Sequence, residues 1–310
     1  MSYPIHQKLV IAIASSALFD LQESNAVFEE KGKDAYIKYQ RENLNHILQK
    51  GVAFPFIRRF LQINAAYPEQ RPVEVVLLSK NDPDTGRRVF NSIKAYGLEI
   101  TRAGFLNGKS PYQYIPAFNV SLFLSANETD VRKAIEAGYP AGIVMHSNII
   151  DDENDRELRV AFDFDGVIAD DESEAVFQKN ENLEEFLTHE NSKAKIPHNP
   201  GPLSELFEKL AFLNRMEAKR EASENGYQRI LRTAIITARS VMASERMVTT
   251  LNTMGISPDE TFFLGGIKKQ GILEVLKPHI FFDDQITHLG SAAGNIPSVH
   301  VPFGIRNKPQ

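Results

Sequence analysis

Val160–Phe177 reads VAFDFDGVIADDESEAVF, and this apolar run followed by a D-x-D pattern decides the fold. A short apolar run bounded by polar residues is typical of a buried strand. A related stretch, Ile11–Phe28, reads IAIASSALFDLQESNAVF and aligns with the first without a gap and with six identities. Two similar strand starts, one in each half of the chain, indicate an internal repeat.

Further matches follow in the same order in both halves. Each half continues with an apolar-periodic helix that begins near a Gly or Pro, then a second strand, a second helix and a third strand. The matched pairs are Gly51–Asn64 with Gly201–Asn214, Val75–Asn81 with Thr233–Arg239, Arg88–Gly97 with Arg246–Gly255, and Ser121–Ser125 with Ile280–Asp284. Alternating strands and amphipathic helices predict right-handed βαβ units and a parallel sheet.

We therefore expect an α/β fold of two Rossmann-like parallel-sheet domains from an internal duplication, residues 1–150 and residues 151–310. A length of 310 residues fits two domains of ~150 residues each. The acidic stretch Asp151–Glu157 has no apolar periodicity and is the expected linker. The apolar stretch Leu9–Phe19 has the length of a signal-peptide core, but its recurrence inside the chain favours a buried strand.

The composition excludes several classes of protein. With 42% hydrophobic and 24% charged residues, the chain is neither disordered nor collagen-like nor a coiled coil. A net charge of −5 offers no electrostatic footprint for nucleic acid or an anionic membrane, so neither is an expected partner. Without Cys there is no disulfide, zinc knuckle or thiol nucleophile, which is compatible with a reducing, cytoplasmic compartment.

The candidate chemistry follows the strands of the second half. In an open parallel sheet, ligands bind outside the carboxyl ends of the strands. The residues in such positions are Asp163 and Asp165 after the first strand, Thr237 and Arg239 after the second, Asp283 and Asp284 after the third, and Lys268 and Lys269 just beyond FLGGI. We expect these four loops to converge on one site.

These residue types suit phosphoryl transfer. Asp163, a backbone carbonyl beside it and Asp284 offer the hard oxygen ligands that Mg²⁺ prefers, and the clustered carboxylates would repel one another without a cation. Thr237 would donate a hydrogen bond to a phosphoryl oxygen, and one of the two lysines would neutralise the developing charge. Asp163 would then be the nucleophile that forms an aspartyl-phosphate.

The order of these motifs resembles that of the haloacid-dehalogenase-like phosphohydrolases. More narrowly, VAFDFDGVIADDESE, RTAIITARS, FFLGG and KPHIFFDDQ are similar to the cytosolic 5'-nucleotidase class I family, as are IAIASSALFDL and the AFPF stretch of the first half. The resemblance covers nearly the whole chain. The DFDG form of the first motif departs from the family's own pattern and is closer to the general superfamily form.

The resemblance implies a role for each residue. Asp163 would accept the phosphoryl group, and Asp165 would protonate the leaving ribose oxygen and then activate water. Mg²⁺ would be held by Asp163, by Asp165 through its carbonyl, and by Asp284. The expected catalytic residues are Asp163, Asp165, Thr237, Lys269 and Asp283, and the expected phosphate or substrate contacts are Phe164, Gly166, Thr237, Ala238, Arg239 and Lys269, with Lys268 as the alternative lysine.

The first half serves as an internal control because its aligned positions lack this chemistry. Asp163 aligns with Ala14, Asp165 with Ser16, Asp283 with Leu124 and Asp284 with Ser125. Without carboxylates a Mg²⁺ site cannot form there. We therefore expect residues 1–150 to be a degenerate, catalytically dead haloacid-dehalogenase-like domain and residues 151–310 to be the catalytic one.

The expected function is Mg²⁺-dependent hydrolysis of a nucleoside 5'-monophosphate, with AMP or IMP as the favoured substrates. The polar segment from Asp170 to Pro200 is too short for a large cap domain and is expected to form a short helical lid. One alternative is a phosphatase of another small phosphometabolite such as a sugar phosphate, and another is a non-enzymatic nucleotide-binding protein. A homo-oligomer is compatible with the sequence.

Overall fold

The computed structural model describes residues 3–148, 151–180, 182–292 and 296–308. The chain divides into two compact units, Met1–Tyr139 and Pro140–Gln310, which we call unit 1 and unit 2. The expected boundary lies beside residues 149 and 150, which are outside the described residues. The structure divides the chain earlier because β5 (Ala141–Val144) pairs antiparallel with β10 (Ser298–His300) and therefore belongs with unit 2.

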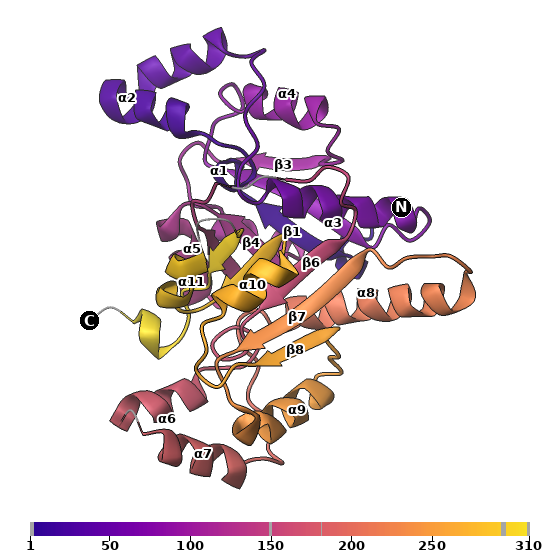
Figure 1. Ribbon diagram of the computed structural model, residues 1–310. Coiled ribbons are helices and arrows are strands. Elements are labelled where there is room, and N and C mark those ends of the chain that lie inside the picture. The colour runs from indigo at the N-terminus through magenta and orange to yellow at the C-terminus, as the bar shows by residue number, and fades with distance from the viewer. Residues whose placement is uncertain (1–2, 149–150, 181, 293–295, 309–310) are drawn as a thin grey trace. The chain divides into compact units, whose positions relative to one another are not determined.

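Unit 1 is built on a parallel sheet with the strand order β3-β2-β1-β4. Every residue of its two central strands is buried, so helices must cover both faces of the sheet. The strands are β1 (Leu9–Ile13), β2 (Val73–Ser79), β3 (Arg102–Phe105) and β4 (Leu122–Ser125). The helices are α1 (Ser15–Leu18), α2 (Gln22–Glu42), α3 (Phe54–Ala66), α4 (Arg87–Ala95) and α5 (Glu128–Glu136), and α2 bends at Gly32 (Figure 1).

Unit 2 has the strand order β5-β10-β9-β6-β7-β8, and all neighbours except β5 and β10 are parallel. Its remaining strands are β6 (Leu158–Phe162), β7 (Leu231–Thr237), β8 (Glu260–Phe263) and β9 (Ile280–Asp283). Its helices are α6 (Glu172–Asn180), α7 (Leu183–Ser192), α8 (Ser204–Ser223), α9 (Ser244–Thr253), α10 (Gln270–Leu276) and α11 (Ile286–Ala292). The expected linker Asp151–Glu157 contains no helix or strand.

Alternation along the strands builds the core of unit 2. Phe162 and Phe282 share one face of the sheet, and the Phe162 ring lies 4.6 Å from the ring of Phe207 on α8. The next residues back, Ala161 and Phe281, pack in a buried cluster with side chains of α10 and α11. Figure 1 shows α10 in front of the strands and α8 behind them. Both faces are thus covered, which holds the carboxyl ends of the strands in fixed positions.

The two units share local structure in detail. The amide of Gly51 donates to the Leu18 carbonyl at 2.9 Å, and the amide of Gly201 donates to the Ile168 carbonyl at 2.8 Å. A Cβ at either glycine would lie within 2.8 Å of backbone atoms, so only glycine fits there. Arg88 and Arg246, at matching positions in α4 and α9, each donate from Nε to a carbonyl in the loop before these glycines.

The register of the last matched strand is one residue away from the expected alignment. Leu122 pairs with Ile11 of β1, and Ile280 pairs with Val160 of β6, so the two strands align on these residues. The aligned partners of the aspartates are therefore Ser125 for Asp283 and Ala126 for Asp284. The expectation of Leu124 and Ser125 was wrong because two uniformly apolar runs carry no internal mark that fixes their phase.

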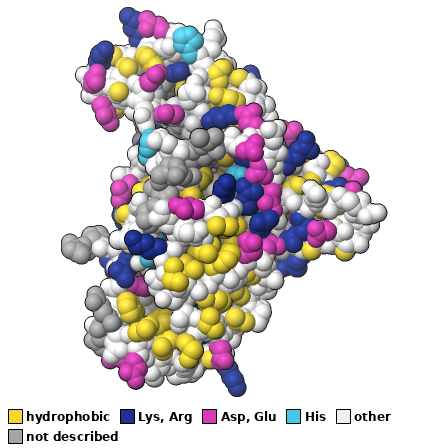
Figure 2. Space-filling model, in the orientation of Figure 1, with side chains coloured by type: hydrophobic (Ala, Val, Ile, Leu, Met, Phe, Trp, Pro, Cys, Tyr) yellow, Lys and Arg dark blue, Asp and Glu magenta, His cyan; other side chains and the backbone are white. Residues whose placement is uncertain are grey.

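The segment expected to form a lid contains α6 and α7, two short helices that contact each other and, through α7, also α9 (Figure 1). The rings of Phe177 and Phe186 meet edge to face at 6.3 Å between these helices. Among the described residues, every helix is too short or too polar to span a bilayer. On the face drawn in Figure 2, Lys and Arg side chains lie among Asp and Glu side chains.

Candidate active site

Three neighbouring strands of unit 2 end in polar residues that are buried. Asp163 follows β6, Thr237 ends β7 and Asp283 ends β9, and these residues are at most 4% exposed. β6 lies between β7 and β9 in the sheet, so the three residues meet at one edge. The amide of Phe164 donates to Oδ1 of Asp163 at 2.7 Å, and the amide of Arg239 donates to Oγ1 of Thr237 at 3.2 Å.

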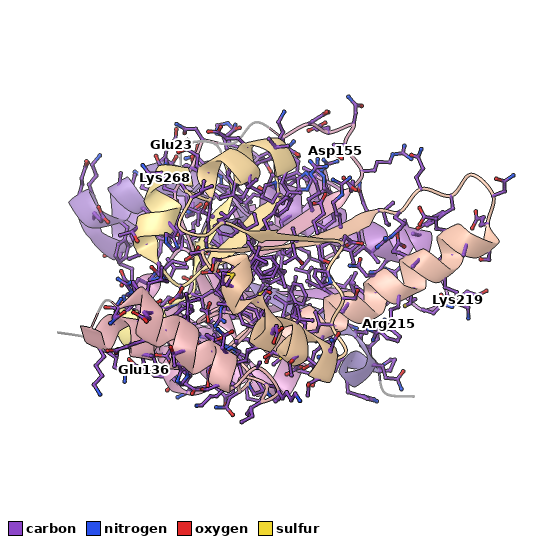
Figure 3. The ribbon with its side chains drawn as sticks, turned by 60° about the horizontal axis from the view of Figure 1, so that its bottom comes forward. Glu23, Glu136, Asp155, Arg215, Lys219 and Lys268 are labelled. Atoms are coloured by element: carbon purple, nitrogen blue, oxygen red, sulfur yellow. The ribbon has the colours of Figure 1, made fainter. Side chains whose placement is uncertain are left out.

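Lys269 joins this site, whereas Lys268 does not. The Lys269 ammonium lies 2.8 Å from Oδ2 of Asp163 and 2.7 Å from Oδ2 of Asp283. Burial alone would lower the pKa of Lys269, but the two carboxylates outweigh burial and raise it, so the ammonium is charged at neutral pH. Lys268, which is labelled in Figure 3, is exposed.

The carboxylates of the site carry more negative charge than Lys269 neutralises. Burial raises the pKa of Asp163 to about 7, helped by the charges of Asp283 and Asp165 against the pull of Lys269. Burial, Asp163 and Asp283 raise the pKa of Asp284 to about 9. A bound cation would favour the ionised form of these acids, because its positive charge offsets the burial and the mutual repulsion that raise their pKa values.

Asp284 offers the best-placed atom for a cation. Its Oδ1 is buried and has no hydrogen-bond partner among the described residues. Gly166 has φ 72°, and a Cβ there would lie 2.7 Å from the carboxyl carbon of Asp284, so a glycine keeps this space open. Buried polar atoms are costly without a partner, and a carboxylate oxygen is a ligand that Mg²⁺ prefers. The residues therefore fit a divalent metal ion.

Asp163, Asp283 and His288 also bring ligand atoms close enough together to hold a metal. The oxygens of Asp283, however, already accept hydrogen bonds from the Lys269 ammonium and, at 2.8 Å, from the amide of Gln285. Nδ1 of His288 also lies 3.2 Å from Oδ1 of Asp283. Burial would raise the pKa of Asp283, but Lys269 and His288 lower it overall. Asp283 thus orients Lys269, while the unpartnered oxygen of Asp284 suits a cation better.

Arg239 holds the carboxylate of Asp165. Its Nε donates to Oδ2 at 2.7 Å and its Nη2 donates to Oδ1 at 2.6 Å, a bidentate pair. Arg239 is 4% exposed, and its guanidinium lies 5.2 Å from the centre of the Phe164 ring and 5.5 Å from that of Phe186. The sequence suggested Arg239 as a contact for the substrate, whereas in this structure its nearest anions are carboxylates of the chain.

Glu190 of α7 is the second anion on Arg239, and sequence reasoning missed it. Glu190 also accepts from Ser173 Oγ at 2.7 Å and from Arg246 Nη1 at 3.0 Å, so it joins α6, α7 and α9 to the active-site loop. Burial would raise the pKa of Glu190, but His198 and Arg239 outweigh burial and hold the pKa well below its usual range. The only signal in the sequence was a glutamate in a polar helix.

The other predicted contacts differ in how they face the site. Phe164 is 0% exposed, and its ring packs against the Arg239 guanidinium and the His198 ring. Ala238 is exposed, and Gly166 is buried beside Asp284. Among the predicted side chains, Lys269 contacts Asp163 and Asp283 directly, and Thr237 ends the strand that pairs with β6.

Comparison of the chain with known proteins identifies its family. A family model described as 5'-nucleotidase matches residues 1–308. Cytosolic 5'-nucleotidase 1B of Homo sapiens is 34% identical over 290 residues, which cover 92% of this chain and 47% of the human protein. The chain thus spans about half the length of this curated relative. With the match running through both units, the chain belongs to the 5'-nucleotidase family.

Proposed function

We propose that unit 2 hydrolyses nucleoside 5'-monophosphates to nucleoside and phosphate, with Asp163 as the nucleophile. The main support is the buried Lys269 ammonium, which lies 2.8 Å from Asp163 and 2.7 Å from Asp283. The same site contains the unpartnered Oδ1 of Asp284. A charged lysine next to a nucleophilic carboxylate at the carboxyl end of a parallel sheet suits phosphoryl transfer. Membership of the 5'-nucleotidase family supports the choice of a nucleotide as substrate.

The metal ligands would be the carboxylates of Asp163 and Asp284 and the backbone carbonyl of Asp165. The carboxylate of Asp165 is occupied by Arg239, which leaves the carbonyl as the ligand it can offer. A bound Mg²⁺ would supply positive charge to the phosphoryl oxygens, in addition to that of Lys269. Asp283 takes no part as a ligand in this scheme because three groups, Lys269, the amide of Gln285 and His288, already contact its oxygens.

The protein residues divide the reaction into two steps. A carboxylate oxygen of Asp163 forms a bond to phosphorus, the bond from phosphorus to the ribose oxygen breaks, and Asp165 gives its proton to that oxygen. Water then attacks the phosphorus of the aspartyl-phosphate, Asp165 takes a proton from this water, and Asp163 leaves as a free carboxylate. Lys269 and Thr237 bind the phosphoryl oxygens in both steps.

Asp165 must leave Arg239 to act in this way. Both carboxylate oxygens of Asp165 accept a hydrogen bond from the Arg239 guanidinium, so at least one of these bonds must open before an oxygen can pass a proton to the substrate. Arg239 also contacts Glu190 of α7. Movement of α6 and α7 over the substrate would therefore change the contacts that Asp165 makes, which is how these helices would act as a lid.

We further propose that unit 1 and unit 2 arose by duplication, and that unit 1 does not catalyse hydrolysis. The shared glycine approaches and the matching arginine contacts support a common origin. Ala14, Ser125 and Ala126 stand where unit 2 has Asp163, Asp283 and Asp284, which removes the carboxylates a metal needs. The human relative is named as cytosolic, and we propose the cytoplasm for this chain too.

The test is phosphate release from a panel of nucleoside monophosphates, including AMP and IMP, and of sugar phosphates. Wild type and Asp163→Asn are compared with Mg²⁺ and with EDTA. The proposal is supported if phosphate is released from nucleotides only with Mg²⁺ and if Asp163→Asn releases none. Since unit 1 is intact in this variant, the same result would show that unit 1 does not hydrolyse these substrates. Release mainly from sugar phosphates would overturn the substrate, and equal activity of Asp163→Asn would overturn the nucleophile.

A further inference from the structure

Unit 1 contains a pocket at the edge of its sheet that corresponds to the catalytic edge of unit 2. The pocket has a volume of about 240 Å³ and lies at the carboxyl ends of β1, β2 and β4. Such an edge is where open parallel sheets bind their ligands. Its lining includes Ser16, Ser79, Lys80, Ser125, Ala126 and Asp130.

Backbone hydrogen bonds fix which positions of the two units correspond. The amide of Ala14 donates to the Leu124 carbonyl at 2.8 Å, just as the amide of Asp163 donates to that of Phe282. The amide of Asn81 donates to Oγ of Ser79 at 3.2 Å, which is the contact that Arg239 makes with Thr237. The phosphate-binding hydroxyl proposed for unit 2 therefore has a serine counterpart in the pocket of unit 1.

The charge of the pocket differs from that of the active site. Ala14, Ser125 and Ala126 replace three carboxylates that in unit 2 repel a phosphate dianion unless a metal is bound. Asp130 is the one carboxylate among the lining residues described, and its Oδ1 lies 3.1 Å from the ammonium of Lys80. The pocket is thus close to neutral, and a dianion entering it meets no uncompensated negative charge.

Hydrogen-bond donors also line the pocket. Ser15 and Ser79 lie 3.0 Å apart through their hydroxyls, and Ser16 and Ser125 add two more hydroxyls to the lining. Lys80 is 39% exposed at its side chain, and an ammonium has three donors, so one can serve Asp130 while others serve a ligand. Hydroxyls and an ammonium are the groups that bind a phosphate through charge-assisted hydrogen bonds.

We propose that this pocket of unit 1 binds the phosphoryl group of a small phosphate monoester without a divalent metal ion. Ser79, Ser125 and Lys80 donate to the phosphoryl oxygens. The pocket volume lies just below the ~300–1,000 Å³ of typical ligand pockets, so the ligand is a small metabolite. This site is separate from the hydrolytic one, and binding here does not depend on the reaction proposed for unit 2.

The experiment is calorimetric titration of the full chain with inorganic phosphate and then with AMP, both in EDTA. The matched pair is Ala126→Asp and Ala126→Asn, since Ala126 is exposed and tolerates either side chain. We expect wild type to bind phosphate and AMP, Ala126→Asp to lose about tenfold or more in affinity, and Ala126→Asn to change about threefold or less. The double variant Lys80→Met/Asp130→Asn, which leaves no buried carboxylate unpaired, should also lose about tenfold.

Three results would overturn the proposal. They are no binding to wild type in EDTA, equal binding to Ala126→Asp and Ala126→Asn, and loss of binding in Thr237→Val, which would assign the phosphate to unit 2. Binding of inorganic phosphate alone, without AMP, would overturn the monoester. Circular dichroism checks that each variant is folded. Hydrolysis of AMP with Mg²⁺, measured on wild type, tests the function of unit 2 separately, so failure of one proposal leaves the other standing.

Discussion

The four matched strands of unit 1 and unit 2 have the same order and share backbone contacts, but the residues at their carboxyl ends differ. Unit 2 ends its strands with Asp163 and Asp283, and unit 1 has Ala14 and Ser125 at these positions. The sheet, the two close glycine approaches and the arginine on the helix are common to both. The difference teaches that the same scaffold can place different side chains at one sheet edge, and only unit 2 has there the carboxylates that the proposed reaction needs.

The largest expected effect comes from replacing Asp163 with an uncharged residue, since unit 1 has the uncharged Ala14 at the corresponding position. Asp163→Asn keeps the shape of the side chain and removes the nucleophile, so we expect kcat for AMP to fall by about 10³-fold or more. Phosphate release measures it. Asp20→Asn, an exposed aspartate of unit 1, is the control and should behave as wild type. A fall of less than about tenfold would mean that Asp163 is not the nucleophile.

Lys269→Met comes next, because it removes the charge that faces the developing negative charge on phosphate. We expect kcat to fall by about 10²–10³-fold. The neighbouring exposed lysine gives a matched control, since Lys268→Met should stay within about twofold of wild type. The variant leaves Asp163 and Asp283 without their shared partner, so thermal unfolding is measured alongside. Equal effects of the two substitutions would contradict the role given to Lys269.

Gly166→Ala tests the space beside Asp284. The new Cβ would press on the Asp284 carboxyl group from 2.7 Å, and the backbone there has φ 72°, so we expect Mg²⁺ affinity to fall about 10–100-fold. Gly32→Ala is the control from unit 1, because Gly32 has φ 77° but nothing within 4 Å of its Cβ. The apparent Kd for Mg²⁺, taken from the activity at graded metal concentrations, is the measurement. An unchanged Kd would remove Asp284 from the metal site.

The smallest effect on turnover is expected for Glu190→Gln, which copies the buried Gln40 found at the corresponding place in α2. Arg239 and Arg246 both lose a charged partner, so we expect a loss of roughly 3 kcal/mol in the free energy of unfolding and a fall of about threefold in kcat. Denaturant unfolding and steady-state kinetics measure the two. A more stable variant would mean that the arginines do not need this charge.

The same variant carries a pH signature. Glu190 has a lowered pKa in the folded state, so its contribution to stability is present above its ordinary pKa of 4.5 and is lost as the pH falls toward the folded value. Glu190→Gln lacks this contribution at every pH. The difference in unfolding free energy between wild type and variant should therefore shrink as the pH is lowered below 4.5, which denaturant unfolding at several pH values checks.

The fold and the acids of the site could be predicted because their signals are local. The apolar run before Asp163 identifies the strand, and the topology of a parallel sheet then brings Asp163, Thr237 and Asp283 together. The partner of Arg239 could not be predicted, because Glu190 reaches it from a helix whose placement depends on tertiary packing. The register of Ser125 against Asp283 was missed for a related reason, since only the pairing of Leu122 with Ile11 fixes it.

The close approach at Gly51 and Gly201 has a consequence for how this chain tolerates mutation. Any side chain at either position meets backbone atoms that cannot yield, so substitution damages the fold of its own unit whether or not that unit performs chemistry. In a library of random variants, substitutions at Gly201 should lower both the activity and the amount of folded protein. Substitutions at Asp163 should lower the activity alone. The two glycines thus act as a reference for folding in each half, against which a purely chemical defect can be recognised.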